Sequence, residues 1–376
     1  MKIAYVYDAV YPWVKGGAEK RVWEIARRMA KNHEVHWYGI NWWEGDEVIE
    51  KEGVHIHGVC DPVELYSEGR RTISEAVYFA RNLLTPLMRE GFDVVDCQEF
   101  PYLPCFSTKI RSFLKRKPWV ITWYEFWDEY WYEYLGSLGH FGRCAERLTL
   151  KLPDRIVAIS DWIKGKLEGV GIKDVAVVPN GVDFDSIRKV EPPSENWDII
   201  YVGRLSEHKN VNLLLESVDK IKESGRNLEV CVIGDGPERE YLESYSEELG
   251  VSDSVEFLGF IESHDEVIGH MKSSKVFVLL STREGFPNTI LEANSCGLPS
   301  IVIDHPENGS VGVVEDGETG FITDFSADSV AEKIISLLDN DKLREKMSEK
   351  ARLYGREHDW SVIVDSLESV YEEVIG

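Results

Sequence analysis

The stretch VFVLLSTREGFPNTILEANSCGLPS, residues 276–300, decides the fold. It opens with an apolar run that is typical of a buried parallel strand. Pro287 favours the first turn of a helix that ends near Cys296, where Gly297 and Pro299 stop it. A strand that leads through a short loop into a helix is the repeating unit of an open α/β sheet. Ligands of such sheets bind beyond the carboxyl ends of the strands, so the loop before Pro287 is expected to face a ligand.

Two glutamates flank this loop. Glu284 lies before the helix, and Glu292 lies about a turn and a half into it, on the side that faces the same ligand. The first amides of the helix, at residues 288–290, would point outward and form an anion site. Gly285 lets a ligand approach the backbone closely. We predict that both carboxylates face a polar ligand. The alternative is a loop glutamate and a solvated helix glutamate.

A second loop with similar character follows another strand. In YVGRLSEHKN, residues 201–210, Gly203, Arg204 and Lys209 come directly after apolar residues. Arginine offers a forked set of donors and lysine a point charge, which suits a diphosphate ligand. Surface ion pairs with Glu207 and its neighbours are the alternative.

Composition and charge indicate two globular domains. The chain has 376 residues, of which 43% are hydrophobic and 29% charged, as in soluble proteins with more than one core. Residues 1–185 carry 24 Lys and Arg against 28 Asp and Glu, a net charge of −4, and residues 186–376 carry 18 against 39, a net charge of −21. This difference favours separate domains. Because a nucleic-acid-binding surface is basic, no nucleic acid is expected as a partner.

Cysteines and apolar runs bear on the compartment. The six cysteines are scattered without a C-x-x-C pair, which favours reduced structural thiols over disulfides or a zinc site. No uncharged apolar run approaches the ~18 residues of a membrane span. The first apolar run stops at Asp8, so we expect a first strand rather than a signal peptide, and a cytoplasmic protein.

Strand-like and helical segments alternate along the chain. This alternation predicts parallel sheets with helices on both faces. The pattern restarts after the polar, proline-containing segment 184–196. We therefore predict two doubly wound, Rossmann-like domains over residues 1–183 and 197–356, joined by the linker 184–196. Two such domains facing each other would make a cleft. The last segment, 357–376, reads as an amphipathic helix without a following strand.

An ordered set of short motifs resembles the retaining glycosyltransferases of the GT-B fold, in the group known as family four or group 1. The motifs occur in the family's order and at its spacings over nearly the whole chain. They are GGAE (16–19), VVPNGVD (177–183), GRLSEHKN (203–210), IGDGPE (233–238), FLGFI (257–261), EGFPNTILE (284–292) and CGLPSI (296–301). The resemblance implies an α/β, GT-B fold with two Rossmann-like domains facing a central cleft, and a final helix that packs back on the N-terminal, acceptor-side domain.

The resemblance also implies roles in a nucleotide-sugar site on the C-terminal domain. Arg204 and Lys209 would hold the diphosphate, Glu284 would lie beside the transferred sugar, and Glu292 would bind the ribose hydroxyls. We therefore predict Glu284, Arg204 and Lys209 as catalytic residues. The other residues predicted to bind the donor are Gly203, Phe260, Ile261, Gly285, Phe286, Asn288, Thr289, Ile290 and Glu292.

Neither a cofactor nor a metal is implied for such an enzyme. The nucleotide-sugar is a substrate, and cations with a helix terminus neutralise its diphosphate. The acidic pair in DFD, residues 183–185, is accordingly interpreted as part of the linker rather than as a metal site.

The acceptor side matches the family less closely. Gly16 and Gly17 follow the first strand and would contact a phosphate or sugar through their amides, or simply form a tight strand–helix turn. Together with Glu19, Tyr124 and Glu125 they are the residues expected at the acceptor.

Two histidine positions of the family are altered in this chain. Many relatives carry a histidine where Tyr124 stands here, and a His-x-His where this chain has Asp96, Cys97 and Gln98, followed by Glu99. Tyrosine donates a hydrogen bond but does not titrate near neutrality. Reduced or lost activity is the alternative that these departures leave open.

Two further runs have open interpretations. Trp123, Trp127 and Trp131 recur every four residues, and we expect them on one helical face, either as core or as an acceptor wall. The basic run KIRSFLKRK, residues 109–117, would contact an anionic membrane as a peripheral site, or is a solvated helix face.

We expect an enzyme that moves a hexosyl unit from a UDP- or GDP-sugar to a glycan or lipid-linked glycan, with retention of configuration. The alternatives are a GT-B enzyme that hydrolyses or epimerises the nucleotide-sugar, and a non-catalytic nucleotide-sugar-binding subunit. The nucleotide base, the sugar, the linkage, the acceptor and the oligomeric state are not specified by these motifs.

Overall fold

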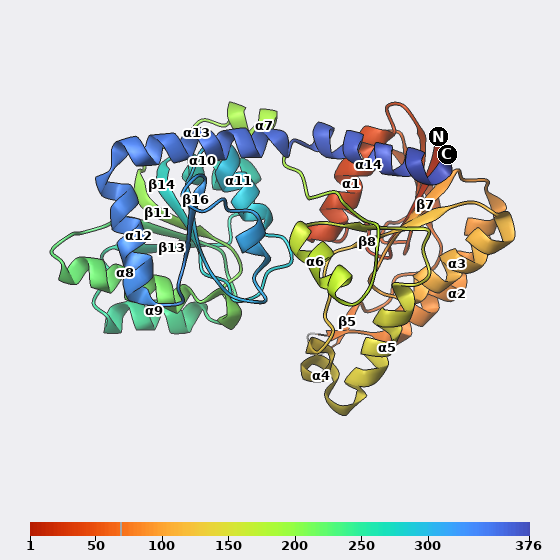
Figure 1. Cartoon of the computed structure of the whole chain (residues 1–376), viewed down its shortest axis with the longest axis horizontal. Helices are drawn as coiled ribbons and strands as arrows, with labels where there is room; N and C mark the ends of the chain where they lie inside the picture. The colour runs from red at the N-terminus through yellow and green to blue at the C-terminus, as the bar shows by residue number, and fades with distance from the viewer. Residues whose placement is uncertain (68–69) are drawn as a thin grey trace. The chain divides into compact units, whose positions relative to one another are not determined.

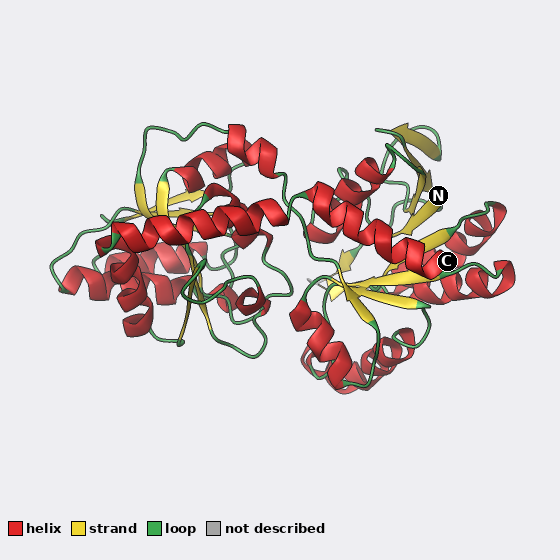
Figure 2. Cartoon of the chain, turned by 45° about the horizontal axis from the view of Figure 1, so that its top comes forward, coloured by secondary structure: helices red, strands yellow, loops and turns green. Residues whose placement is uncertain are grey.

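The computed structural model describes residues 1–67 and 70–376. Contacts divide the chain into two compact units. Unit 1 comprises Met1–Asn180 and Trp360–Gly376, and unit 2 comprises Gly181–Asp359. In each unit, helices lie on both faces of a sheet (Figure 2). Both units therefore have the α/β layering that the alternation of segments predicts.

Unit 1 is built on an eight-stranded sheet in the order β10-β9-β8-β7-β1-β2-β4-β3. Its neighbouring strands are parallel, apart from the antiparallel pair of β3 and β4. The order moves outward from β1 in both directions, as in a doubly wound sheet. The strands of unit 1 are β1 (Lys2–Val6), β2 (Glu34–Gly39), β3 (Val48–Lys51), β4 (Val54–Gly58), β7 (Val94–Gln98), β8 (Trp119–Trp123), β9 (Arg155–Ala158), β10 (Val175–Val177) and the separate pair β5 (Tyr66–Ser67) and β6 (Arg70–Arg71).

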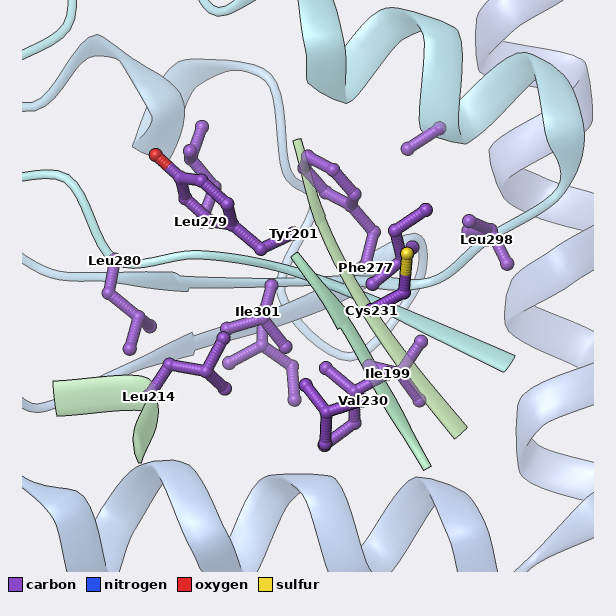
Figure 3. Close-up of a cluster of buried hydrophobic side chains, with 14 of the residues drawn as sticks. Ile199, Tyr201, Leu214, Val230, Cys231, Phe277, Leu279, Leu280, Leu298 and Ile301 are labelled. Carbon is purple, nitrogen blue, oxygen red and sulfur yellow. The ribbon is translucent and has the colours of Figure 1, made fainter. Parts of the chain in front are cut away.

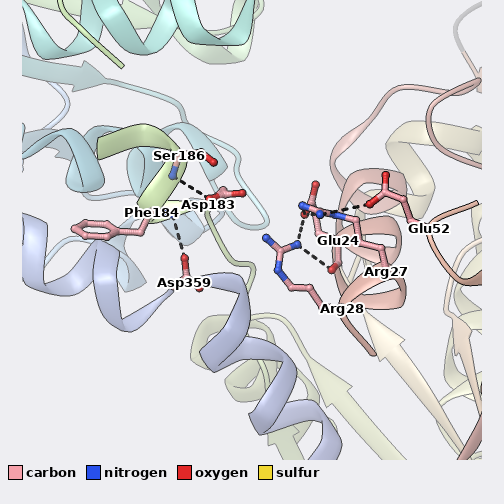
Figure 4. Close-up of polar contacts among 8 residues, drawn as sticks. All are labelled: Glu24, Arg27, Arg28, Glu52, Asp183, Phe184, Ser186 and Asp359. Carbon is pink, nitrogen blue, oxygen red and sulfur yellow. Dashed lines mark hydrogen bonds and ion pairs between the residues drawn. The ribbon is translucent and has the colours of Figure 1, made fainter. Parts of the chain in front are cut away.

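The helices of unit 1 bury apolar stripes against this sheet. In α1, buried Val22, Ile25 and Met29 lie three or four residues apart, which is the spacing of one helical face. Its outer side carries Glu24, which pairs with Arg27 and Arg28 in Figure 4. The helices of unit 1 are α1 (Gly17–Met29), α2 (Ile73–Arg89), α3 (Leu103–Lys115), α4 (Tyr130–Leu135), the 3₁₀ turn η1 (Gly136–Leu138), α5 (Gly139–Thr149), α6 (Asp161–Gly169) and α14 (Trp360–Ile375).

The C-terminal helix α14 belongs to unit 1 and packs on α1 (Figure 1). Its apolar face is buried from Trp360 to Tyr371. The Tyr371 hydroxyl donates to the buried carboxylate of Asp96 in β7 at 2.6 Å. Nε2 of His33, just after α1, lies 2.8 Å from the Glu368 carboxylate. Two polar contacts in the C-terminal half of α14 thus accompany the apolar packing of this helix.

Unit 2 contains a six-stranded sheet of parallel strands in the order β13-β12-β11-β14-β15-β16. Its core is dense and apolar: Ile199, Val230 and Ile301 are buried on one face of the sheet and Phe277 on the other, each from a different strand (Figure 3). Such strands are buried on both faces, which explains their continuous apolar sequences. The strands of unit 2 are β11 (Trp197–Val202), β12 (Val230–Ile233), β13 (Val255–Gly259), β14 (Ser274–Leu279), β15 (Ser300–Ile303) and β16 (Gly320–Thr323).

Helices cover both faces of the unit 2 sheet. α8 packs against α12, and α11 packs against α13. The helix expected from Pro287 to Cys296 is α11, and Gly297 ends it in the left-handed conformation that glycine favours, with φ 82°. The helices of unit 2 are α7 (Phe184–Lys189), the 3₁₀ turn η2 (Glu207–Lys209), α8 (Val211–Glu223), α9 (Arg239–Glu248), α10 (His264–Lys272), α11 (Asn288–Cys296), the 3₁₀ turn η3 (Gly309–Gly312), α12 (Ala327–Asp339) and α13 (Asp341–Glu357).

The two chain segments that lead out of unit 2 are tied to each other. The Val182 amide donates to the His358 carbonyl at 2.9 Å, and Val182 forms a parallel bridge with Asp359. The Asp359 carboxylate also accepts from the Phe184 amide at 3.1 Å (Figure 4). Both ends of unit 2 therefore lie at one point of its surface.

The linker expected over residues 184–196 begins instead with a packed helix. Asp183 caps α7 by accepting from the Ser186 amide at 3.0 Å (Figure 4), and Ile187 is buried in the core of unit 2. Sequence composition missed this helix because it is only six residues long and carries four polar or charged side chains. The acidic pair of DFD is thus explained in part by capping.

Among the described residues, no helix combines the length and the apolar character that crossing a bilayer requires.

Candidate active site

Strand order brings two loops of unit 2 together at the carboxyl edge of its sheet. β11 and β14 are neighbours, so the loops that follow them start side by side. The Thr282 amide donates to the His208 carbonyl at 2.9 Å, and the Asn210 side chain donates to the Leu280 carbonyl at 2.8 Å. These bonds fix the loop after β11 against the loop after β14.

The pairing of these loops places Lys209 on Glu284. Nζ of Lys209 contacts Oε1 of Glu284 as a hydrogen-bonded ion pair, and both side chains are largely buried. The backbone of Glu284 is held from the other side, because its amide donates to the Glu307 carbonyl and its carbonyl accepts from the Gly309 amide at 2.8 Å. A charged pair with so little freedom is a preorganised group rather than a surface ion pair.

The backbone at Gly309 passes very close to the backbone at Glu284 and Gly285. A Cβ atom on Gly309 would lie 2.4 Å from the Gly285 carbonyl oxygen, so no larger residue fits there without moving the loop. Gly285 was expected to allow a close approach to the backbone. Gly309, from the loop after β15, also permits a close approach at this point, here between two segments of the chain.

Arg204 borders a pocket of about 440 Å³ at the same edge of the sheet. Within residues 1–67 and 70–376, the side chain of Arg204 has no hydrogen-bond or ion-pair partner. Phe260, at the pocket rim, is largely exposed. The pocket is lined by Val202, Gly203, Arg204, Ile233, Gly234, Asp235, Gly236, Phe260, Ile261 and Val267.

Glycines allow three loops to meet in this pocket. Gly234 has φ 136°, and a Cβ atom there would lie 1.9 Å from the Gly203 carbonyl oxygen. The Gly203 amide donates to the Ile233 carbonyl at 3.0 Å, and the Gly234 amide donates to the Gly259 carbonyl at 2.8 Å. The glycine-rich turn after β12 thus has a structural role, and it brings the loops after β11, β12 and β13 into contact.

Pro287, the residue before α11, makes no side-chain capping bond to this helix. However, the Ile290 amide donates to the Pro287 carbonyl at 3.0 Å, and the Ile290 side chain is fully buried in the core. Ile290 was predicted to bind the donor; in the structure its amide is already bonded within the first turn. An anion at this terminus would be met by the amides of Asn288 and Thr289 instead.

Cationic side chains concentrate around these loops. The pKa of His208 is lowered, chiefly by burial and then by the nearby charges of Lys209 and Arg283, against the opposing effect of Glu284. A site that disfavours a further positive charge is suited to an anion.

Unit 1 carries its own polar cluster at the carboxyl edge of its sheet. The Tyr124 hydroxyl, just after β8, donates to the Gln98 side chain at 2.6 Å, and the Tyr124 and Glu125 amides donate to Oε1 of Glu99. Glu99 is fully enclosed, and burial raises its pKa to about 8 in spite of these amide bonds. Burial also raises the pKa of Asp96 to about 6. Where relatives carry histidines, this chain therefore builds a network of buried carboxyls, a tyrosine and a glutamine.

Glu19 folds back over the glycine pair at the start of α1. A Cβ atom on Gly16 would lie 2.3 Å from a Glu19 carboxylate oxygen, so the glycine makes room for that side chain. Burial raises the pKa of Glu19. Gly16 has an extended backbone and Gly17 begins the helix, as a tight strand–helix turn requires.

Three residues of this cluster were not predicted from the sequence. Asp8, directly after β1, is fully buried and pairs with the Arg71 guanidinium, and Glu75 lies 4.0 Å from the same guanidinium. Burial and the neighbouring Asp8 carboxylate raise the pKa of Glu75 to about 9. A charged residue at the end of the first strand was a usable signal for Asp8, whereas no local pattern points to Arg71 or Glu75.

Two family models match the chain in succession. The model described as Glycosyltransferase Family 4 matches residues 15–186, and the model described as Glycosyl transferases group 1 matches residues 183–354. The chain belongs to the group 1 glycosyltransferases.

Curated relatives of this glycosyltransferase include partial and full-length matches. It is 32% identical to an alpha-D-kanosaminyltransferase of Streptomyces kanamyceticus over 47% of this chain and 45% of the relative. It is 27% identical to a phosphatidyl-myo-inositol mannosyltransferase of Mycobacterium tuberculosis over 58% of this chain and 60% of the relative. It is 28% identical to an uncharacterised glycosyltransferase of Methanocaldococcus jannaschii over 97% of this chain and 96% of the relative. The first two matches thus span less than two thirds of those relatives.

Solved structures confirm the predicted fold of the glycosyltransferase. A sucrose-phosphate synthase from Thermosynechococcus elongatus superposes with a TM-score of 0.78 at 17% identity, covering 99% of this chain and 98% of that one. The Anabaena protein HepE, solved in complex with UDP, superposes with a TM-score of 0.76 at 18% identity, covering 99% and 100%. The GT-B architecture with two Rossmann-like domains is therefore shown.

The tryptophan series of the glycosyltransferase does not form one helical face. Trp123 ends β8 and Trp131 lies in α4, and both are buried in the core. Trp127 lies between these elements, half-buried, with its indole donating to Glu125 at 2.7 Å. The prediction of a continuous helix was wrong, because Asp128 adopts a left-handed conformation with φ 41° and the helix begins only after it.

Within residues 1–67 and 70–376, no group of three or more His, Cys, Asp or Glu side chains has a geometry that could hold a metal ion. The cysteines of the described chain are free, and Cys97 and Cys105 are buried neighbours.

Proposed function

We propose that this glycosyltransferase moves a hexosyl group from a UDP- or GDP-sugar to a glycan or lipid-linked glycan, with retention of configuration at the transferred carbon. The observation that carries this proposal is the constellation at one edge of the unit 2 sheet. There, Arg204 borders a pocket, Lys209 is paired with Glu284, and α11 begins at Asn288, four residues after Glu284. The complex of HepE with UDP supports a nucleotide in a protein of this fold.

Each part of the proposed donor meets a group suited to it. The nucleoside would enter the pocket beside Phe260 and Ile261. The diphosphate would lie between Arg204, Lys209 and the first amides of α11, which supply positive charge without a metal ion. Glu284 would contact the sugar hydroxyls.

The positive charges around the diphosphate would favour cleavage of its bond to the sugar. As the bond from the sugar to the diphosphate breaks, negative charge grows on the leaving diphosphate, and fixed donors stabilise that charge more than the ground state. The Lys209–Glu284 pair would open as the ligand enters, so that Lys209 turns to phosphate and Glu284 to the sugar. No cofactor takes part in this scheme, and the reaction would take place in the cytoplasm, where nucleotide-sugars serve as donors.

A thermal-shift screen tests the donor site. We expect one of UDP, GDP, ADP or their hexose conjugates to raise the melting temperature, because a ligand at 100 times its Kd stabilises the native state by about 2.7 kcal/mol. Glu292→Gln should abolish most of that shift, since it removes the proposed partner of the ribose hydroxyls. Glu332→Gln on α12, an exposed glutamate, is the matched control. A shift that survives Glu292→Gln unchanged, or no shift with any nucleotide, would favour a non-catalytic or decayed site.

We also propose that α3 rests on an anionic membrane, which suits a lipid-linked acceptor. Its polarity is inverted: Ser107, Thr108, Arg111 and Ser112 are buried. Its apolar residues face outward, with Ile110 48%, Phe113 77% and Leu114 60% exposed. Among the residues that the structure describes, α2 packs alongside, and Ser107 donates to its Ala80 carbonyl.

The charges around the apolar face of α3 indicate what kind of surface it contacts. Lys109, Lys115 and Arg116 border it on a protein whose net charge is −25. A basic border around exposed apolar side chains is complementary to an anionic lipid surface, which offers both negative charge and an apolar interior. Each basic residue near such a surface contributes about 1 kcal/mol, and exposed phenylalanine and leucine side chains add apolar burial.

Vesicle sedimentation tests the membrane contact. The protein should bind vesicles containing phosphatidylglycerol and not pure phosphatidylcholine, with binding that weakens as salt rises. Reversing two charges with Lys115→Glu and Arg116→Glu should reduce partitioning by at least about 10-fold. Lys346→Glu with Lys350→Glu on α13 is the matched control. Equal binding to both lipids would contradict the role of charge, and no binding to either would leave α3 as a solvated helix.

A further inference from the structure

The first residue of α10 touches the glutamate proposed to bind ribose. Nε2 of His264 lies 2.9 Å from Oε1 of Glu292 in α11. His264 is half-exposed, with 51% of its side chain accessible, whereas Glu292 is largely buried at 13%. Because an ionised carboxylate only accepts hydrogen bonds, Nε2 must carry the proton and donate it.

The local structure holds His264 next to the nucleoside pocket. Ser263 caps α10 and accepts from the Glu266 amide, which fixes the first turn. Val267, three residues after His264 and so on the same side of the helix, lines the pocket. Ile261, just before the helix, lines it as well. His264 therefore contacts the Glu292 carboxylate from a helix whose Val267 lines the pocket.

We propose that His264 is a positioning residue that orients Glu292 for the two ribose hydroxyls and so makes the site selective for ribonucleotides. This inference rests on the proposed function. A carboxylate has two oxygens with about four acceptor positions. The His264 donor occupies one position on Oε1 and restrains rotation of the carboxylate, which holds it in the orientation that meets the two hydroxyls.

The fold of α10 does not depend on this imidazole. Val267, Ile268 and Met271 supply its buried face, and Ser263 supplies its cap. A change at His264 should therefore alter ligand binding without altering the melting temperature of the free protein. This separates a positioning role from a structural one.

Calorimetric titration with UDP, GDP and their 2′,3′-dideoxy forms tests the inference. For the nucleotide that binds, His264→Ala should weaken binding of the ribose form about 5-fold, the effect of one net hydrogen bond, and change binding of the dideoxy form less than about 2-fold. His264→Gln should restore most of the ribose affinity, since its amide donates at similar reach. Asp265→Ala, in the same exposed turn, is the matched control.

The outcomes separate this inference from the proposed function. If wild-type protein prefers the ribose form and Glu292→Gln abolishes that preference while His264→Ala does not reduce it, the positioning role is wrong and the donor site stands. Equal losses for ribose and dideoxy forms in His264→Ala would likewise overturn the positioning role. If Glu292→Gln leaves ribose binding unchanged, the assignment of the donor site itself fails.

Discussion

Replacing Arg204 with alanine should lower the rate of donor cleavage by about 100- to 1,000-fold, the loss seen when one preorganised donor to a developing negative charge is removed. Arg204 borders the pocket with a guanidinium that pairs with no other side chain in the described chain. Its forked donors are therefore free to meet a diphosphate, and they would gain most as charge builds on the leaving group. The free energy of unfolding should change little, because the side chain is exposed.

Release of nucleoside diphosphate from UDP-hexose or GDP-hexose measures this effect, with the donor chosen from the thermal-shift screen. Lys275→Ala is the matched control, since Lys275 is an exposed cation of the same unit that pairs with Asp198. If Arg204→Ala and Lys275→Ala behave alike, the loop after β11 does not hold the diphosphate.

Glu284→Gln should reduce turnover by about 100-fold while nucleotide affinity changes less than about 3-fold. The reason lies in what the carboxylate touches. Its backbone is fixed by Glu307 and Gly309, and its side chain meets Lys209, so it is placed for the sugar rather than for the nucleoside. Glu292→Gln should give the opposite pattern, with weaker nucleotide binding and a smaller effect on turnover at saturation.

Steady-state rates combined with calorimetric titration of the free nucleotide distinguish the two glutamates. Glutamine keeps the shape of each side chain, and comparison of melting temperatures checks that both variants fold. Identical profiles for the two variants would contradict the separate roles, and two silent substitutions would remove the donor site from this edge of the sheet.

The positions of the residues in the proposed donor site could be predicted from sequence because the signals are local. Pro287 and Gly297 mark the two ends of α11, and the strand before it is continuous and apolar. Arg204 and Lys209 follow a strand directly, so the carboxyl-edge rule placed them correctly without knowledge of the strand order. The contact between Lys209 and Glu284 could not be predicted in this way, because it depends on β11 and β14 being neighbours in the sheet. No local sequence pattern contains that information.

The polar cluster of unit 1, where we propose that the acceptor binds, was less predictable because its contacts are long-range. Arg71 reaches Asp8 across 63 positions of the chain, and Tyr371 reaches Asp96 across 275. The tryptophan spacing suggested a helix, but a left-handed residue between Trp127 and Trp131 interrupts it. Likewise, the sequence marks α3 as basic, yet only the packing reveals that its apolar residues face outward.

The bridge between Val182 and Asp359 makes unit 2 a segment that could be exchanged as a whole. Because unit 2 begins and ends at one point, residues 181–359 resemble a domain inserted into unit 1. Removing them would leave two ends of unit 1 close together, where they could be joined. A protein arranged in this way can exchange unit 2 for another domain of the same fold while unit 1, completed by α14, keeps its own core. New pairings of donor and acceptor could therefore arise by recombination at two junctions rather than by rebuilding either half.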